Sequence, residues 1–336
     1  MAGLPRGVSP PRIVRQILPL GGVMESNPEF SSKHPVRSGQ PIADESELRR
    51  LIPTDRRDHC FLLGFYPEQE ARQVLQGKGL EQDHFDEIMK RWATARALIE
   101  SLSPLSYEPE VRPILEPEVL LEISKVMDRP DSKQMFPDGT WSVSLLQLSG
   151  IIPFQPNIDL GYAASLGEET LNHADILSAV KLCFPYGKPS TLAVSVDQPQ
   201  KAITVSGINP SLQVVGFHCG QQDAQGPFVI SLYISAGPNL VQTTRYRGRY
   251  FLTNGYHRAY RLMRAGFTHI PCLVRNANNI AETGALAPGF FPESLLMSPR
   301  PPLFTDFTDE VLAITVPTHA AKKVVRIRPD EYLVLG

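Results

Sequence analysis

The chain has 336 residues, of which 42% are hydrophobic, 20% charged and 8% aromatic. This length suits one large or two ordinary domains, and the composition excludes a small disulfide-stapled scaffold, a wholly disordered chain and a collagen-like fibre. With 33 Lys and Arg against 35 Asp and Glu, the net charge of −2 argues against a globally basic nucleic-acid binder.

The N-terminal end has the composition of a tail. Residues 1–24 contain arginine but no acid, and residues 25–43 are rich in Ser, Pro, Gly and Asn, which favours loop. We expect residues 1–43 to be disordered. Two alternatives are a transit peptide, which is typically Arg-rich and acid-poor, and translation from Met24, which would leave 1–23 as a leader.

Residues 44–130 are predicted to form a small helical region. A short helix is expected at 67–77, and it should end near Gly77 and Gly79. The clearest helix is expected at 83–102, where apolar side chains recur at steps of three and four residues and Asp83 is the expected N-cap. A further helix is expected at 117–127, after a Pro-rich stretch that favours extended chain.

From residue 140 onward the pattern changes to short β-type runs with short helices between them. Turn residues at 129–139 mark the boundary, and the alternation is typical of an α+β or mixed α/β domain, which we place at 140–280. Residues 281–336 are predicted to be a Pro-rich C-terminal extension with a terminal strand at 323–327. The other strands are expected at 141–148, 191–196, 202–205, 213–217, 228–234, 249–252 and 269–274, and the helices at 160–166 and 176–182.

The four cysteines, at 60, 183, 219 and 272, carry no metal or disulfide signature. None forms a Cys-x-x-Cys pair, and none lies beside a histidine at zinc-ligand spacing. We therefore expect reduced, mostly buried thiols in a cytoplasmic protein. No apolar run reaches the roughly 18 residues that a membrane span needs, so we expect no membrane partner.

An acid-free window between Asp223 and Glu282 is the one segment with a clear chemical signal. Its 58 residues hold seven arginines, which gives +7 in a chain whose net charge is −2. Two explanations stay open: ion pairs with acids elsewhere, such as the acidic 100–122 region, or an anion site, since guanidinium groups match phosphate and carboxylate geometry. The arginines are Arg245, Arg247, Arg249, Arg258, Arg261, Arg264 and Arg275.

Within this window a strand, a glycine turn and a helix follow one another. The strand is expected at 250–252 and the helix at 256–265, with an Asn-Gly turn between them and Gly266 as the helix stop. The first helical turn then carries His257 and Arg258. Free backbone N–H groups and the positive end of the helix dipole make such a turn a ready anion site.

A family resemblance rests on residues 250–259, which read Tyr-Phe-Leu-Thr-Asn-Gly-Tyr-His-Arg-Ala. Together with the helix that ends at Gly266 and the Ile-Pro-Cys-Leu-Val of 270–274, this run resembles the signature of ParB/sulfiredoxin-like domains. The Ile-Pro-Phe-Gln-Pro of 152–156 resembles the opening segment of ParB N-terminal domains. The two matches bracket residues 140–277.

The resemblance implies a compact α+β mixed-sheet domain that binds a nucleotide, with the phosphates over the glycine turn. An insertion near 197–228 is needed to fit the length of the family domain. By resemblance, Gly255, His257 and Arg258 would contact the phosphates, and His257 and Arg258 are the candidate catalytic residues. The candidate ligand-binding residues are Asn254, Gly255, Tyr256, His257, Arg258 and Arg261.

Three departures from the family limit the reaction that the resemblance implies. Tyr256 stands where sulfiredoxins have their catalytic cysteine, so reduction of a cysteine sulfinate at this position is not available. ParB proteins usually have Glu there, and Tyr256 cannot ligate Mg²⁺ as a carboxylate would. Only about 60 Pro-rich residues follow the motif, too few and too broken for the helix-turn-helix domain of ParB proteins.

The first hypothesis is a protein that binds a nucleoside triphosphate or another phosphorylated ligand at 254–258, with or without Mg²⁺. Hydrolysis or phosphoryl transfer would then use arginines to stabilise charge on the phosphate. Asp159, which follows the 152–156 match, is a candidate metal ligand, and His269 is expected to be structural.

The second hypothesis is a non-catalytic nucleic-acid-associated or regulatory module. Arg245, Arg247 and Arg249 alternate along an expected strand and would share one face, and Arg261 with Arg264 would extend this surface along a helix. Such a surface could contact a phosphate backbone. A third hypothesis is a protein that acts through partners, with the Pro-rich segments 100–117 and 288–302 as docking segments.

Overall fold

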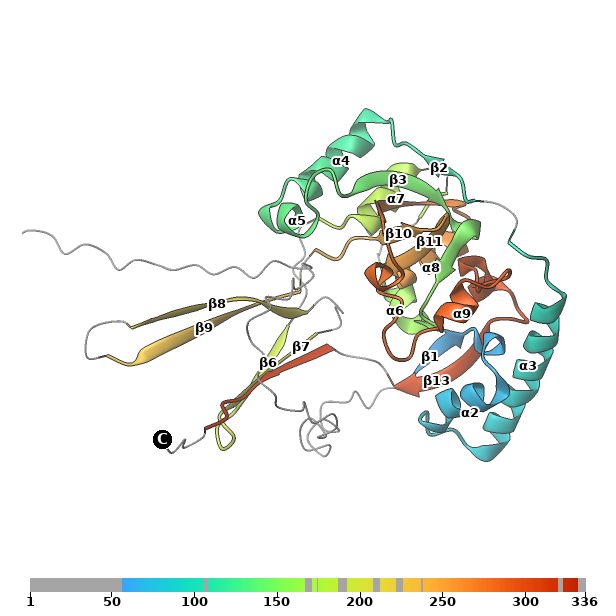
Figure 1. Cartoon of the computed structure of the whole chain (residues 1–336), viewed down its shortest axis with the longest axis horizontal. Coiled ribbons are helices and arrows are strands. Elements are labelled where there is room, and N and C mark those ends of the chain that lie inside the picture. The colour runs from blue at the N-terminus through green and yellow to red at the C-terminus, as the bar shows by residue number, and fades with distance from the viewer. Residues whose placement is uncertain are drawn as a thin grey trace, which may run out of the picture. The chain divides into compact units, whose positions relative to one another are not determined.

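The computed structural model of the chain (Figure 1) contains two compact units. Unit 1 comprises 1–40, 190–237 and 323–336, and unit 2 comprises 41–189 and 238–322. The expected tail, with Met24, lies outside the described residues. The structure describes residues 56–105, 108–166, 171–173, 175–186, 192–207, 212–221, 226–236, 238–319 and 323–331.

Unit 2 is built on a six-stranded mixed sheet with the order β2-β3-β12-β10-β11-β4. The pairs β10–β12 and β11–β4 are parallel, and the other neighbours are antiparallel. Together with the helices this confirms the α+β class. The strands are β2 (Val111–Arg112), β3 (Ser142–Gln147), β12 (His269–Asn276), β10 (Gln242–Tyr246), β11 (Arg249–Asn254) and β4 (Ile151–Pro153).

A second, three-stranded antiparallel sheet in unit 2 joins segments that are distant in sequence. Its central strand β1 (Arg56–Phe61) pairs with β13 (Ile314–His319) on one side and with β5 (Asn157–Asp159) on the other. None of these three strands was expected from the sequence. Their register places His59 opposite Asp159.

The helices of unit 2 agree closely with the sequence expectation. The clearest correction concerns Asp83, which lies in the first turn of its helix, while Glu81 is the N-cap and makes no side-chain cap bond. A short helix, α5, also forms inside the segment expected to be turns. The helices are α2 (Glu68–Gln76), α3 (Gln82–Ser101), α4 (Pro117–Met127), α5 (Pro130–Met135), α6 (Leu160–Ser165), α7 (Ile176–Cys183), α8 (Tyr256–Arg264) and α9 (Glu293–Leu296).

One hydrophobic core unites regions of unit 2 that the sequence separates. Ile88 of α3 and Val119 of α4 belong to the same buried cluster as Phe251 of β11 and Phe304 of the C-terminal segment. Figure 1 shows α2 and α3 beside β1 and β13. The described part of the expected helical region, from residue 56 to 130, and much of the expected C-terminal extension therefore fold with the sheet, which cuts across the boundaries expected from the sequence.

Unit 1 is an all-β unit within the described residues. Strands β14 (Lys323–Ile327), β7 (Ala202–Gly207) and β6 (Ala193–Asp197) form an antiparallel sheet in that order, which confirms the terminal strand. Strands β8 (Gln213–Gln221) and β9 (Phe228–Ser235) form a separate hairpin. The insertion expected near 197–228 falls within this unit.

The cysteines and the membrane prediction can be checked against the described residues. All four cysteines are free, and three of them are buried while Cys219 is exposed, as expected for mostly buried thiols. In the described part of the chain, no helix combines the length and apolar character needed to cross a bilayer.

Candidate anion site at the start of helix α8

The chain passes from β11 to α8 through a single left-handed residue, Gly255, with φ of +104°. A Cβ atom at this position would lie 2.7 Å from a methyl carbon of Val241. Only glycine adopts this backbone conformation without strain and also fits the space beside Val241. Asn254, the other residue of the expected turn, stays in the strand and donates its side-chain N–H to the Asn239 amide oxygen at 3.0 Å.

The other end of α8 also follows the sequence expectation. Gly266 has φ of +88° and its N–H donates to the carbonyl of Met263. The N–H of Phe267 donates to the carbonyl of Leu262, which completes a Schellman motif. The helix length is therefore fixed by local chemistry at both ends.

The first turn of α8 presents backbone donors without a protein cap. No side chain among the described residues caps the helix, and no acid lies in its first turn. The N–H of Ala259 donates to the carbonyl of Gly255 at 2.9 Å, so the N–H groups of the preceding helical residues have no partner in the helix ladder. These donors and the helix dipole favour a negative charge beside the turn.

Tyr256 ties α8 to the 152–156 segment. Its hydroxyl accepts hydrogen bonds from the backbone N–H groups of Phe154 at 2.9 Å and Gln155 at 3.1 Å. The side chain is buried, and burial raises the pKa of the phenol. The structure thus brings the two segments of the resemblance together and gives Tyr256 a positioning contact.

His257 is held as a neutral imidazole. The backbone N–H of Asp159 donates to its Nε2 at 3.2 Å, so this nitrogen carries no proton. Burial lowers the pKa of His257 to about 4, and the ring of Tyr162 packs edge-on against it at 4.7 Å between centroids. The residue expected to contact phosphate therefore has no positive charge at neutral pH.

Arg258 carries a buried charge that is held only by neutral acceptors. Its guanidinium donates to the carbonyls of Cys183, at 3.2 Å, and of Asn239, and to the Asn239 amide oxygen at 2.8 Å. The residue is 6% exposed, and no carboxylate of the described chain pairs with it. Burial lowers the pKa of Arg258. A buried cation without a counter-charge is unfavourable, so the site is electrostatically suited to an anion.

A second cluster, which sequence reasoning missed, lies beside His257. Arg57 and His59 project from β1 toward Asp159, whose carboxylate oxygen lies 3.5 Å from the Arg57 guanidinium and 3.8 Å from His59 Nε2. The side-chain N–H of Asn157 points at His59 Nδ1 at 3.2 Å, which leaves the proton on Nε2. That Nε2 is buried and has no hydrogen-bond partner among the described residues.

Asp159 has a clear local role that differs from the metal ligand considered above. Its carboxylate accepts from the N–H of Tyr162 at 2.8 Å and so caps α6. In the described residues no group of three His, Cys, Asp or Glu side chains is arranged to hold a metal ion. The site therefore combines a buried guanidinium, an outer guanidinium, neutral imidazoles and one carboxylate.

The remaining arginines of the acid-free window are spread over separate elements of unit 2. Arg245 pairs with Glu108 at 3.1 Å, as one of the two explanations anticipated for the acidic 100–122 region. Arg247 and Gly248 form the two-residue loop of the β10–β11 hairpin, with φ of 49° and 76°. The expectation that Arg245, Arg247 and Arg249 share one strand face is therefore wrong, because the chain reverses between them.

The helix face with His257 and Arg261 turns toward α6. The Arg261 guanidinium donates to the carbonyl of Ala164 at 3.1 Å, while Arg264 is exposed. His269 lies 3.4 Å from the Glu110 carboxylate, as suits a structural histidine. The structure thus brings Asn254, Gly255, His257 and Arg258 together, and Arg261 lies one turn farther along α8.

Comparison with known proteins gives no match for this chain among family models, curated proteins or solved structures.

Proposed function

We propose that the chain binds a phosphorylated small molecule, such as a nucleoside triphosphate, at the start of α8. The observation that carries this proposal is the buried Arg258 guanidinium, which has only neutral acceptors in the described residues. It belongs to the first turn of a helix that has no side-chain cap. A phosphate group would supply the missing negative charge and accept hydrogen bonds from the free backbone N–H groups.

The arrangement of strands around this turn supports the ParB/sulfiredoxin-like resemblance. Strand β11, the Gly255 turn, α8 and β12 follow one another, and β4 runs parallel to β11 with the 152–156 segment at its end. In this reading Arg57, whose side chain is 38% exposed, supplies a second guanidinium at the rim. We propose binding, rather than catalysis, as the primary activity. Tyr256, His257 and Arg258 each already make hydrogen bonds within the protein that fix their orientation.

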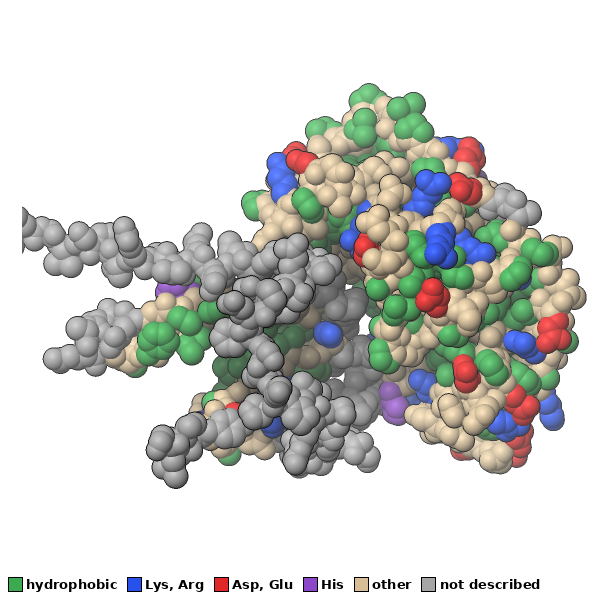
Figure 2. Space-filling model, in the orientation of Figure 1, with side chains coloured by type: hydrophobic (Ala, Val, Ile, Leu, Met, Phe, Trp, Pro, Cys, Tyr) green, Lys and Arg blue, Asp and Glu red, His purple; other side chains and the backbone are tan. Residues whose placement is uncertain are grey.

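Nucleic-acid binding through an arginine surface is the weaker proposal. The arginines of the acid-free window separate into a hairpin loop, an ion pair with Glu108 and contacts with backbone carbonyls. Figure 2 shows Lys and Arg interspersed with Asp and Glu over the visible face of unit 2, without one large basic patch. A phosphate backbone is bound most strongly where several cations lie together.

A thermal-shift panel of nucleoside triphosphates, with and without Mg²⁺ and with inorganic phosphate and sulfate, tests the proposal. A ligand at about 100 times its Kd stabilises the folded chain by roughly 2.7 kcal/mol, which is about 5–11 °C for a domain of the size class of unit 2. Arg258→Met should weaken binding by at least about tenfold, which lowers this stabilisation to about 1.4 kcal/mol or less. The matched control is Arg264→Met, which removes an exposed guanidinium from the same helix and should keep it.

Two outcomes would contradict the proposed site. One is an equal shift in Arg258→Met and Arg264→Met, which would place the ligand elsewhere. The other is the absence of a shift with every anion in the panel. If Arg258→Met does not fold, Arg57→Met at the rim is the replacement variant, with Arg56→Met on the same strand as its control; an equal shift in those two proteins would also contradict the site.

A further inference from the structure

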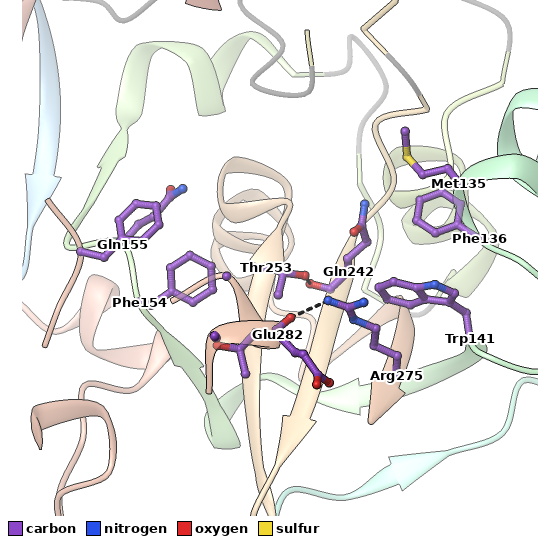
Figure 3. Close-up of a pocket in the computed structure, with 13 residues that line it drawn as sticks. Met135, Phe136, Trp141, Phe154, Gln155, Gln242, Thr253, Arg275 and Glu282 are labelled. Atoms are coloured by element: carbon purple, nitrogen blue, oxygen red, sulfur yellow. Dashed lines mark hydrogen bonds between the residues drawn. The ribbon is translucent and has the colours of Figure 1, made fainter. Parts of the chain in front are cut away.

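Unit 2 contains a cavity of about 400 Å³ whose lining is aromatic at two ends and polar between them. Figure 3 shows Phe136 and Trp141 on one side, Phe154 and Gln155 on the other, and Thr253, Gln242 and Arg275 between them. The volume lies in the roughly 300–1,000 Å³ range of small-molecule sites. It is therefore large enough for a ligand.

This cavity lies on the opposite face of the sheet from α8. The hydroxyl of Thr243 contacts Cys272, on the face where α7 packs against β12 and α8. Thr244 points to the other face, where Arg275 Nε lies 3.4 Å from its hydroxyl. Thr253 shares that second face, because its strand pairs Phe251 with Thr244. The cavity thus lies on the other face of the sheet from α8, although Phe154 and Gln155, which line it, donate backbone N–H groups to the Tyr256 hydroxyl.

The charged groups around the cavity are already engaged by the protein. The Arg275 guanidinium lies over the Trp141 ring at 4.9 Å and donates to the carbonyl of Glu282 at 2.5 Å. The Glu282 carboxylate accepts from the backbone N–H of Asn278 and the side chain of Asn279. Because Arg275 and Glu282 both line the cavity, a cationic ligand would lie beside the guanidinium and an anionic ligand beside the carboxylate, which favours an uncharged one.

The carboxamides of Gln155 and Gln242 supply the hydrogen-bonding groups of the cavity that the protein does not already engage. The Gln155 side chain makes no hydrogen bond with the described residues, and Gln242 makes one long contact of 3.4 Å to the carbonyl of Leu240. The Thr253 hydroxyl donates to the backbone carbonyl of Gln242 at 2.9 Å. Each carboxamide presents a donor and an acceptor side by side.

We propose that this cavity binds an uncharged planar heteroaromatic ring of the nucleobase class. Aromatic side chains line both ends of the cavity, and stacking of bases on aromatic residues is favourable for every base. A glutamine carboxamide matches the adjacent donor and acceptor on a base edge, as in its paired contact with adenine. An aliphatic ligand would leave both carboxamides without partners, and an acid would lie beside the Glu282 carboxylate, which also lines the cavity.

Fluorescence of Trp141 provides a direct test. The chain has two tryptophans, so Trp92→Phe leaves Trp141 as the reporter. Titration with adenosine, guanosine, cytidine, uridine and thymidine should give saturable quenching by at least one nucleoside. Gln155→Leu and Gln242→Leu should each weaken that binding by at least about tenfold, the size of one lost base-edge pair. Gln73→Leu, on the exposed face of α2, is the matched control.

The nucleosides carry no phosphate, so this test is independent of the proposed function. Arg258→Met, if folded, should bind the nucleoside as the parent does. Absence of quenching by all five nucleosides would overturn the proposal. Equal binding of toluene, or unchanged affinity in both glutamine variants, would also overturn it, because either result would mean that the ring edge is not recognised.

Discussion

Replacing Gly255 with alanine tests whether the turn before α8 has the geometry described above. The backbone has φ of +104°, where an L-residue costs roughly 1–2 kcal/mol. The added methyl group would also lie 2.7 Å from one Val241 methyl carbon and 3.1 Å from the other. Val241 is fully buried, and overpacking of this kind costs about 1–3 kcal/mol. We expect Gly255→Ala to lose about 2–5 kcal/mol in total.

The matched control for this substitution is Gly139→Ala. Gly139 has φ of +79°, and a Cβ atom there would meet no atom within 4 Å, so only backbone strain remains. Urea unfolding followed by circular dichroism gives both free energies of unfolding. The difference between the two variants isolates the contact with Val241.

A double variant sharpens this measurement. If the methyl group added by Gly255→Ala meets Val241, then Val241→Ala should relieve part of the loss, and the double variant should be more stable than the sum of the single changes by about 1–2 kcal/mol. A Gly255→Ala protein no less stable than Gly139→Ala, together with additive effects in the double variant, would refute the turn geometry.

Two further predictions concern the first turn of α8. The folded pKa of His257 is about 4 against an ordinary 6.5, so the unfolded chain binds the extra proton and stability falls as the pH drops from about 6.5 to 4. The loss should reach roughly 3 kcal/mol, measured by urea unfolding at several pH values, and His257→Gln should flatten the profile, with His59 adding a residual slope of the same sign. An unchanged profile in His257→Gln would exclude this histidine as the source. Tyr256→Phe should cost about 1–3 kcal/mol, because two backbone N–H groups lose their acceptor; a variant as stable as the parent would show that water replaces the hydroxyl.

The parts of the fold that follow from local chemistry could be predicted from the sequence. The helix at 117–127 begins with proline at its first position and has a periodic apolar face, and α8 lies between two glycines with positive φ. These signals act over a few residues, so they favour the same helices in any tertiary context that buries the apolar face.

The parts that depend on distant pairing could not be predicted. Strand β1 is bracketed by β13 and β5, which lie far from it in sequence, so nothing near Arg57 and His59 indicates that they meet Asp159. The hairpin turn at Arg247 could not be predicted, because an arginine with φ of 49° lacks the usual Asn-Gly signal. The partners of Arg258 likewise come from Cys183 and Asn239, which only the folded chain brings together.

The measurement that bears most directly on the anion site is isothermal titration calorimetry of the best triphosphate ligand with three proteins. These are the parent chain, Arg258→Lys, which keeps the charge but loses the planar fork, and Arg258→Met, which loses both. The site predicts that affinity falls in that order, with a total loss of at least about tenfold, or roughly 1.4 kcal/mol. The same Kd in all three folded proteins would contradict the claim that the buried guanidinium at the start of α8 holds the anion.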